Sequence, residues 1–124
     1  MIKIVVADPH PIIFKGVKSF FRNSTEISVI GKTINFLELL NFLKSKKIDI
    51  VLLEIDLPGL DGLQVIKSLK ERFHYVNFLI FSSLNEEVYA IDNQASRVNN
   101  QIAILKSDEV LEYIVGDKKN RLQF

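Results

Sequence analysis

The stretch that decides the fold is IVLLEIDLPGLDG, residues 50–62. Its first four residues are apolar and branched, which is typical of a parallel strand buried on both faces. The pair Pro58-Gly59 then breaks the strand. Because open α/β sheets place their sites beside the carboxyl ends of the strands, this stretch carries the carboxylate of Glu54 to the edge where such sites form.

Apolar strands alternate with segments of helical period along the rest of the chain. Strands are predicted at Ile2–Ala7, Ile27–Gly31, Asp49–Leu53, Asn77–Phe81 and Gln101–Leu105. Apolar stripes with helical spacing lie between them: Phe14, Val17, Phe20 and Phe21; Leu37, Leu40 and Leu43; Leu63, Ile66 and Leu69. Short right-handed crossovers leave few alternatives, so we expect an α/β fold with a five-stranded parallel sheet covered by helices on both faces.

Polar residues mark where several of the helices should begin. Asn35 and Glu38 have the spacing of a capping box, and Asp61 precedes the third apolar stripe. Ser107 is expected to open the last helix. The segment 86–94 is compatible with a further helix. It is the weakest of the predicted elements.

Composition narrows the class of protein. The chain has 124 residues, of which 48% are hydrophobic and 25% are charged, and this predicts one globular domain. No apolar run approaches the roughly 20 residues that span a bilayer, and the first residues run directly into a strand, so we expect a cytoplasmic protein without membrane contact. The absence of cysteine excludes disulfides and thiolate chemistry. A net charge of +1 provides no overall field for nucleic acid.

Four short motifs then occur in a fixed order at the predicted strand ends. They are DPHP at 8–11, the stretch 50–62, IFSS at 80–83 and ILK at 104–106. Over about residues 1–116 the sequence resembles a bacterial response-regulator receiver domain, with 117–124 as a tail or the start of a linker. The opening and the ending most resemble receivers that precede LuxR-type helix-turn-helix domains. The resemblance implies a doubly wound, flavodoxin-like three-layer sandwich with strand order 2-1-3-4-5.

The resemblance also implies a phosphorylation site with two departures. Receivers accept a phosphoryl group on an aspartate that ends the third strand, beside a Mg²⁺ ion, and Glu54 occupies that position here. Asp8 matches the first member of the metal-binding acidic pair, whereas Pro9 replaces the second and offers no oxygen. The backbone carbonyl of Asp56 stands at the remaining metal position. We therefore expect weak or lost Mg²⁺ binding and no cofactor.

The positions that contact the phosphoryl group or respond to it match those of receivers only in part. Ser82 matches the hydroxyl that contacts it, and Lys106 matches the lysine that pairs with it. Ala103 replaces the aromatic residue that usually switches on strand five. Phosphoryl transfer is sensitive to misplacement of about 1 Å, and the side chain of Glu54 is one methylene longer than aspartate. We expect a degenerate, phosphorylation-independent receiver that is not an enzyme.

The partners implied by the resemblance are a second copy of the chain in a homodimer and a sensor kinase. DNA would be contacted only through an output domain outside this chain. The alternative functions are a stand-alone receiver-like adaptor and, on the pattern Glu54-Ile55-Asp56, a haloacid-dehalogenase-like phosphatase, although that motif belongs on a first strand with an aspartate nucleophile. For Asp8 a second interpretation stays open, in which its side chain caps the turn into the first helix.

Overall fold

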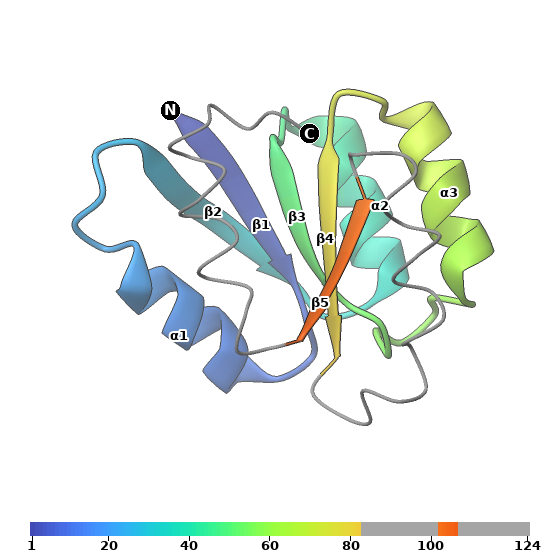
Figure 1. Cartoon of the computed structure of the whole chain (residues 1–124), viewed down its shortest axis with the longest axis horizontal. Helices are drawn as coiled ribbons and strands as arrows, with labels where there is room; N and C mark the ends of the chain where they lie inside the picture. Colours follow the sequence, from blue (N-terminus) through green and yellow to red (C-terminus); the bar gives the residue numbers. More distant parts are fainter. Residues whose placement is uncertain (83–101, 107–124) are drawn as a thin grey trace.

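The computed structural model describes residues 1–82 and 102–106. Its strands form one parallel sheet in the order β2-β1-β3-β4-β5, which confirms the predicted doubly wound fold (Figure 1). The strands are β1 (Ile2–Ala7), β2 (Ile27–Thr33), β3 (Ile50–Glu54), β4 (Asn77–Ser82) and β5 (Ile102–Lys106). Each lies within two residues of its predicted bounds, and β1 matches at both ends.

In the described residues, three helices cover the two faces of this sheet. They are α1 (Pro11–Phe20), α2 (Phe36–Ser45) and α3 (Leu63–Arg72). Helix α1 lies on one face, and α2 and α3 lie on the other (Figure 1). The predicted helix at 86–94 and the helix start at Ser107 lie outside the described residues. Within the described ranges, no helix combines the length and apolar character needed to cross a membrane.

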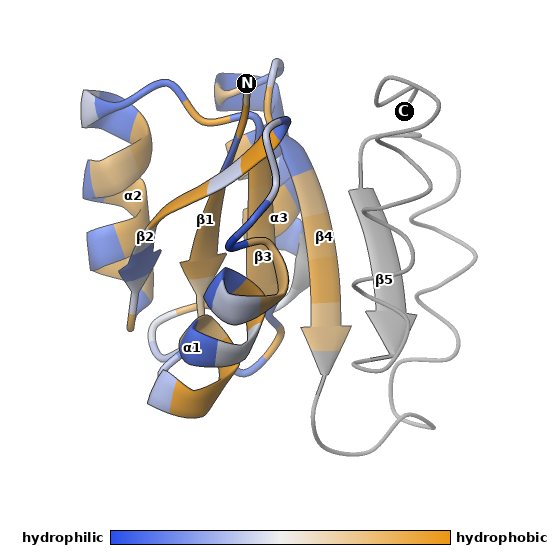
Figure 2. Cartoon of the chain, turned by 90° about the vertical axis from the view of Figure 1, so that its left-hand side faces the viewer, coloured by the Kyte–Doolittle hydropathy of each residue, from blue (hydrophilic) through white to orange (hydrophobic). Residues whose placement is uncertain are grey.

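The strand β3 divides the hydrophobic core into two parts. Successive side chains of a strand point to opposite faces, so Val51 and Leu53 pack with α2 and α3, whereas Ile50 and Leu52 pack on the side of α1. All five residues of β3 are buried, which explains why the strand reads as an unbroken apolar run. Figure 2 shows the same pattern as continuous hydrophobic colour on the central strands, with helices that are hydrophobic on one side only.

One member of each of two predicted helical stripes lies outside the core. Phe20 is 54% exposed, although its ring contacts that of Phe21 edge-on at 4.9 Å. Leu37 is 65% exposed. The buried residues of α2 are Leu39 and Leu43, and Leu40 packs partly buried against the same core, so Leu37 alone of the predicted stripe turns outward. These two predictions of core residues were wrong because several leucines and phenylalanines compete for one face.

The helix starts differ in how they are capped. For α2 the N-cap half of the predicted capping box is confirmed, because Glu38 N donates to Asn35 Oδ1 at 2.8 Å. The carboxylate of Glu38 accepts instead from Ile34 N, the residue before the N-cap, at 3.0 Å. For α3 the N-cap residue is Gly62, with a φ of 81° that favours glycine, so Asp61 precedes the cap and does not supply it.

The edge strand β2 contains a bulge. Ile4 pairs with Val29 and the next residue of β1, Val5, pairs with Gly31, so Ile30 is left without a partner in the ladder. Gly31 also permits a close contact, since a Cβ added there would lie 2.8 Å from the ring of Phe42. The bulge and this glycine lie where β2 passes close to Phe42 of α2.

Candidate functional site

The predicted site positions meet at the carboxyl edge of the sheet. Ala7 pairs with Leu53 in the parallel ladder, so the residues that follow them, Asp8 and Glu54, lie at one level on neighbouring strands. Both are acidic and both are buried, with exposed fractions of 2% and 1%. Two carboxylates are therefore brought together at the strand ends where α/β folds place their sites.

The remaining predicted positions reach the same edge through the backbone. Glu54 pairs with Phe81, the residue before Ser82, and Ser82 pairs with Lys106 at the end of β5. Ala103 pairs with Leu79, further back along the ladder. The structure describes the strand positions of Ser82, Ala103 and Lys106 and not their side chains, so their assigned contacts stay predictions.

The side chain of Asp8 folds back onto its own loop. Its Oδ1 accepts a hydrogen bond from the backbone N–H of His10 at 2.6 Å and lies 2.8 Å from His10 Nδ1. Its backbone N–H donates to the carbonyl of Thr33 at 2.9 Å. This is an Asx turn leading into α1, whose first residue is Pro11. The geometry supports the capping interpretation of Asp8 for one of its two oxygens.

The second oxygen of Asp8 has a different environment. Among the described residues, Oδ2 is buried without a hydrogen-bond partner, and so is Thr33 Oγ1. Buried polar atoms are nearly always paired with protein or ordered water, so this oxygen is the part of the pocket most able to accept a further donor. One oxygen of Asp8 is therefore bound within its own turn, and the other can accept a hydrogen bond at the sheet edge.

His10 is the site residue that the sequence reasoning missed. Its side chain is 60% exposed at the rim, where the ring pairs with the fully buried carboxylate of Asp8. A histidine without a second ligand at metal spacing gives no metal signal. The signal that could have found it is the spacing Asp8-Pro9-His10, because an aspartate commonly accepts a hydrogen bond from the backbone two residues on.

The loop after β3 is held in a defined conformation. Leu57 N donates to the carbonyl of Glu54 at 3.0 Å, and Leu57 and Leu60 are both buried in the core. The carbonyl of Pro58 accepts from Phe36 N at 2.8 Å, which ties the loop to the start of α2. Gly59 has a φ of 86° and approaches Phe36 so closely that an added Cβ would lie 3.2 Å away.

The residues present do not fit a pre-formed magnesium site. Pro9 contributes no side-chain oxygen, and Oδ1 of Asp8 is occupied by His10. Asp56 is exposed, and over 1–82 no three His, Asp or Glu side chains lie close enough together to hold a metal ion. Mg²⁺ demands near-octahedral coordination by oxygens, which this arrangement does not supply.

A buried cation lies at the opposite end of the sheet, between α3 and β4. The ammonium group of Lys70 donates to the carbonyls of His74 and Val76, the latter at 2.5 Å. Burial lowers the pKa of Lys70, because desolvation disfavours the charged form. The sequence reasoning missed it among the polar residues of α3. Its place four residues after the buried Ile66 was the available signal.

Comparison with known proteins gives one consistent result. Residues 4–111 match the family model described as the response regulator receiver domain. The uncharacterized transcriptional regulatory protein YhcZ of Bacillus subtilis is 34% identical over 89 residues, covering 72% of this chain and 42% of that protein. The nitrate/nitrite response regulator protein NarL of Escherichia coli is 30% identical over 84 residues, covering 68% of this chain and 39% of NarL.

The solved structures agree on the fold. The isolated receiver domain of RcsB from Salmonella enterica serovar Typhimurium, in the presence of phosphomimetic BeF₃⁻, superposes with a TM-score of 0.80 at 19% identity. That match covers 99% of this chain and 91% of the RcsB domain. The chain spans about two fifths of the length of the two curated relatives, YhcZ and NarL.

Proposed function

The chain belongs to the response-regulator receiver family, and from that premise we propose that it is a receiver that works without a phosphoryl switch. Its curated relatives include regulators of the NarL type. In this proposal residues 1–116 form the receiver and 117–124 are a tail or the start of a linker. The domain is not itself an enzyme, and it acts in the cytoplasm through contacts with other proteins.

The observation that carries the proposal is the way Asp8 is used. One oxygen of its carboxylate is bound by the backbone and ring of His10, and the neighbouring position, which should supply a second acid, is Pro9. A phosphoryl group carries concentrated negative charge, and transfer depends on a metal ion that neutralises it and aligns the reactants. With the metal ligands reduced in this way, Mg²⁺ binding should be weak and transfer slow.

The length of the Glu54 side chain is a second reason to expect slow phosphoryl transfer. Its carboxylate reaches one methylene further than aspartate, and a displacement of about 1 Å is enough to slow a reaction that depends on alignment. The same longer reach would place a permanent negative charge toward Ser82 and Lys106, whose strand positions share this edge. We therefore propose that Glu54 holds the domain in a single state, in the role that a phosphoryl group would otherwise have.

The partners follow from the relatives and remain part of the proposal. YhcZ and NarL are described as a transcriptional regulatory protein and a response regulator, and this chain spans about two fifths of each. We propose that the domain is the N-terminal regulatory part of a DNA-binding regulator, that it self-associates, and that DNA is contacted only by an output domain outside this chain. A sensor kinase would then be a docking partner and not an efficient phosphoryl donor.

Phosphorylation by acetyl phosphate with Mg²⁺ tests the proposal directly. We expect no stoichiometric labelling of the natural chain by mass spectrometry. Glu54→Asp alone should be labelled slowly, and the double variant Glu54→Asp with Pro9→Asp should be labelled efficiently, because it restores both acceptor and metal ligand. Stoichiometric labelling of the natural chain that disappears in Glu54→Gln would refute the proposal.

Self-association tests whether the negative charge of Glu54 sets the state of the domain. Sedimentation of the natural chain and of Glu54→Gln, at matched concentrations, should show weaker association of the variant if the charge sets the state. Equal association of the two proteins would remove Glu54 from the mechanism and leave a receiver whose state is set elsewhere.

A further inference from the structure

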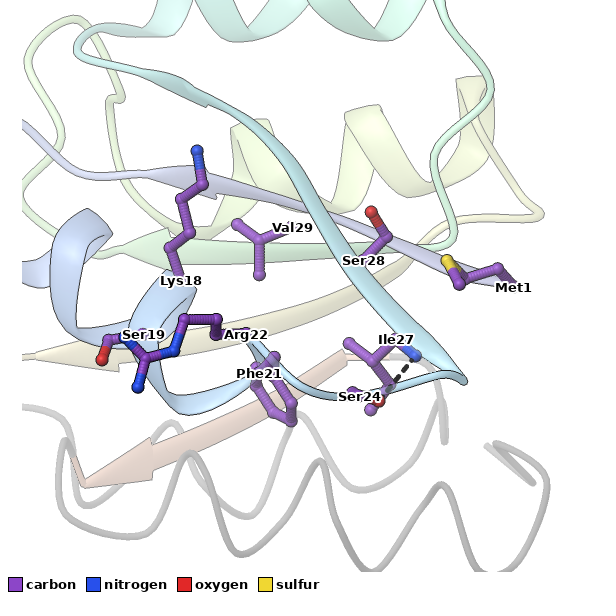
Figure 3. A pocket seen from close by; sticks show the side chains of 9 residues that line it. All are labelled: Met1, Lys18, Ser19, Phe21, Arg22, Ser24, Ile27, Ser28 and Val29. Carbon is purple, nitrogen blue, oxygen red and sulfur yellow. Dashed lines mark hydrogen bonds between the residues drawn. The ribbon is translucent and has the colours of Figure 1, made fainter.

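A groove opens at the amino edge of the sheet, at the end opposite Asp8 and Glu54. It lies between the end of α1 and the start of β2 and has a volume of about 480 Å³ (Figure 3). Small-molecule sites usually fall between about 300 and 1,000 Å³. The groove is therefore large enough to hold a small organic ligand and is independent of the carboxyl edge.

The floor of the groove is apolar and belongs to the core. Phe21 and Ile27 are 7% and 2% exposed, and both are members of the core cluster beneath α1. Val29 is partly buried against the same cluster. Figure 3 shows these apolar side chains between two cationic side chains at one end and Met1 at the other. A ligand with an elongated apolar body would gain favourable burial along this floor.

The charge of the groove is positive. Lys18 and Arg22 line it, are exposed, and are four residues apart, and none of the described residues that line it is acidic. The ammonium groups of Lys18 and Lys32 each lie 5.5 Å from the centre of the Phe14 ring, which gathers further positive charge beside the groove. In a chain with a net charge of +1, this is a local excess that suits an anion.

Ser24 adds a directed donor. Its Oγ accepts hydrogen bonds from the backbone N–H groups of Glu26 and Ile27 at 3.1 and 3.0 Å. A hydroxyl has two acceptor lone pairs and one donor, so the hydrogen that remains on Ser24 is available to an acceptor in the groove. The lining thus offers donors and cations above an apolar floor.

We propose that this groove binds a medium-chain carboxylate, with its carboxylate at the end lined by Lys18 and Arg22 and its alkyl chain along Phe21 and Ile27 (Figure 3). Guanidinium and ammonium groups together are good partners for a carboxylate. The apolar floor distinguishes this ligand from inorganic phosphate. The proposal does not depend on whether the carboxyl edge is phosphorylated.

The test is titration of the full chain with sodium octanoate below its micelle concentration, followed by amide chemical shifts and by calorimetry. We expect saturable binding, with the largest shifts in β2 and at the end of α1. The double variant Lys18→Gln with Arg22→Gln should weaken binding at least ten-fold. The matched control, Lys44→Gln with Lys46→Gln, removes the same charge from exposed positions on and beside α2 and should bind as the natural chain does.

A chain-length series checks the apolar floor. From butanoate to octanoate, each added methylene should tighten binding up to about four-fold, the limit set by complete burial of a methylene group. Equal weakening by the two double variants, shifts that map outside the groove, or binding that ignores chain length would overturn the proposal. Concentration-dependent dimerisation that is lost in the Lys18 and Arg22 variant, without octanoate binding, would also overturn it and assign the surface to a second copy.

Discussion

The two ends of the sheet differ in how far their charged side chains are buried. At the carboxyl edge, Asp8 and Glu54 are buried, with exposed fractions of 2% and 1%. At the amino edge, Lys18 and Arg22 lie exposed above an apolar floor. Burying a charge costs free energy unless partners compensate it, whereas an exposed charge stays hydrated and available. On this reasoning the buried charge of Asp8 carries some cost to stability at the carboxyl edge, whereas the exposed cations of the amino edge carry almost none.

Lys70 is the exception at the amino edge and yields the largest expected effect. Its buried ammonium group satisfies the carbonyls of His74 and Val76. Replacement in Lys70→Met keeps much of the side-chain volume and leaves both carbonyls without this donor, so we expect the free energy of unfolding to fall by about 2 kcal/mol. Urea denaturation at pH 7 measures this change.

The matched control is Lys18→Met, which removes an exposed lysine and should change the free energy of unfolding by less than about 0.5 kcal/mol. If the two variants were equally stable, the hydrogen bonds of Lys70 would contribute nothing, and the contrast between buried and exposed cations would fail.

The contribution of Lys70 should also depend on pH. Burial lowers its pKa in the folded state below the ordinary value of 10.5, which applies to the unfolded chain. Between these two pKa values the unfolded chain binds more protons, so this group makes the folded state more stable as pH rises toward 10.5. The stability difference between the natural chain and Lys70→Met should therefore widen over that range, as followed by urea denaturation at increasing pH.

At the carboxyl edge, Asp8→Asn should be stabilising. The substitution keeps an oxygen that can accept from the His10 backbone and removes a buried negative charge whose second oxygen lacks a hydrogen-bond partner among the described residues. We expect the free energy of unfolding to rise by about 1 kcal/mol. Thermal and urea denaturation, both in the presence of a metal chelator, measure the gain.

A loss of stability in Asp8→Asn would contradict this expectation. It would mean that the carboxylate charge is compensated in solution by a bound cation or an ordered donor, and the cost assigned to the carboxyl edge would have to be withdrawn.

The smallest effect is expected for the cations of the groove. Because Lys18 and Arg22 are exposed, the double variant Lys18→Gln with Arg22→Gln should change the free energy of unfolding by less than about 0.5 kcal/mol. Urea denaturation in the absence of octanoate measures it. A large loss would show that these side chains support the fold, and weaker octanoate binding by that variant would then have a structural cause.

The strands could be predicted closely because their signal is local. A run such as Ile50–Leu53 has no helical period, and the pair Pro58-Gly59 soon stops it, so the sheet edge follows directly from the sequence. The inward faces of the helices were harder to predict. Phe20 and Leu37 are as apolar as their buried neighbours, and only packing against the sheet decides which residues turn inward.

The positions of the site residues could be predicted from the sequence, but only part of their contacts could. Strand ends gave the places of Asp8 and Glu54, since register follows from the order of the strands. The pairing of Asp8 with His10 depends on the conformation of one turn. Lys70 and the groove depend on contacts between segments distant in the chain, which no short motif records.

The bulge at Ile30 has a consequence for the behaviour of the protein at high concentration. An edge strand displays unpaired backbone groups that can recruit a strand from another molecule and start aggregation. Because Ile30 interrupts the ladder of β2, an incoming strand could not continue the hydrogen bonding in regular register along this edge. The irregularity should therefore protect this edge against intermolecular sheet growth and help keep the protein in solution.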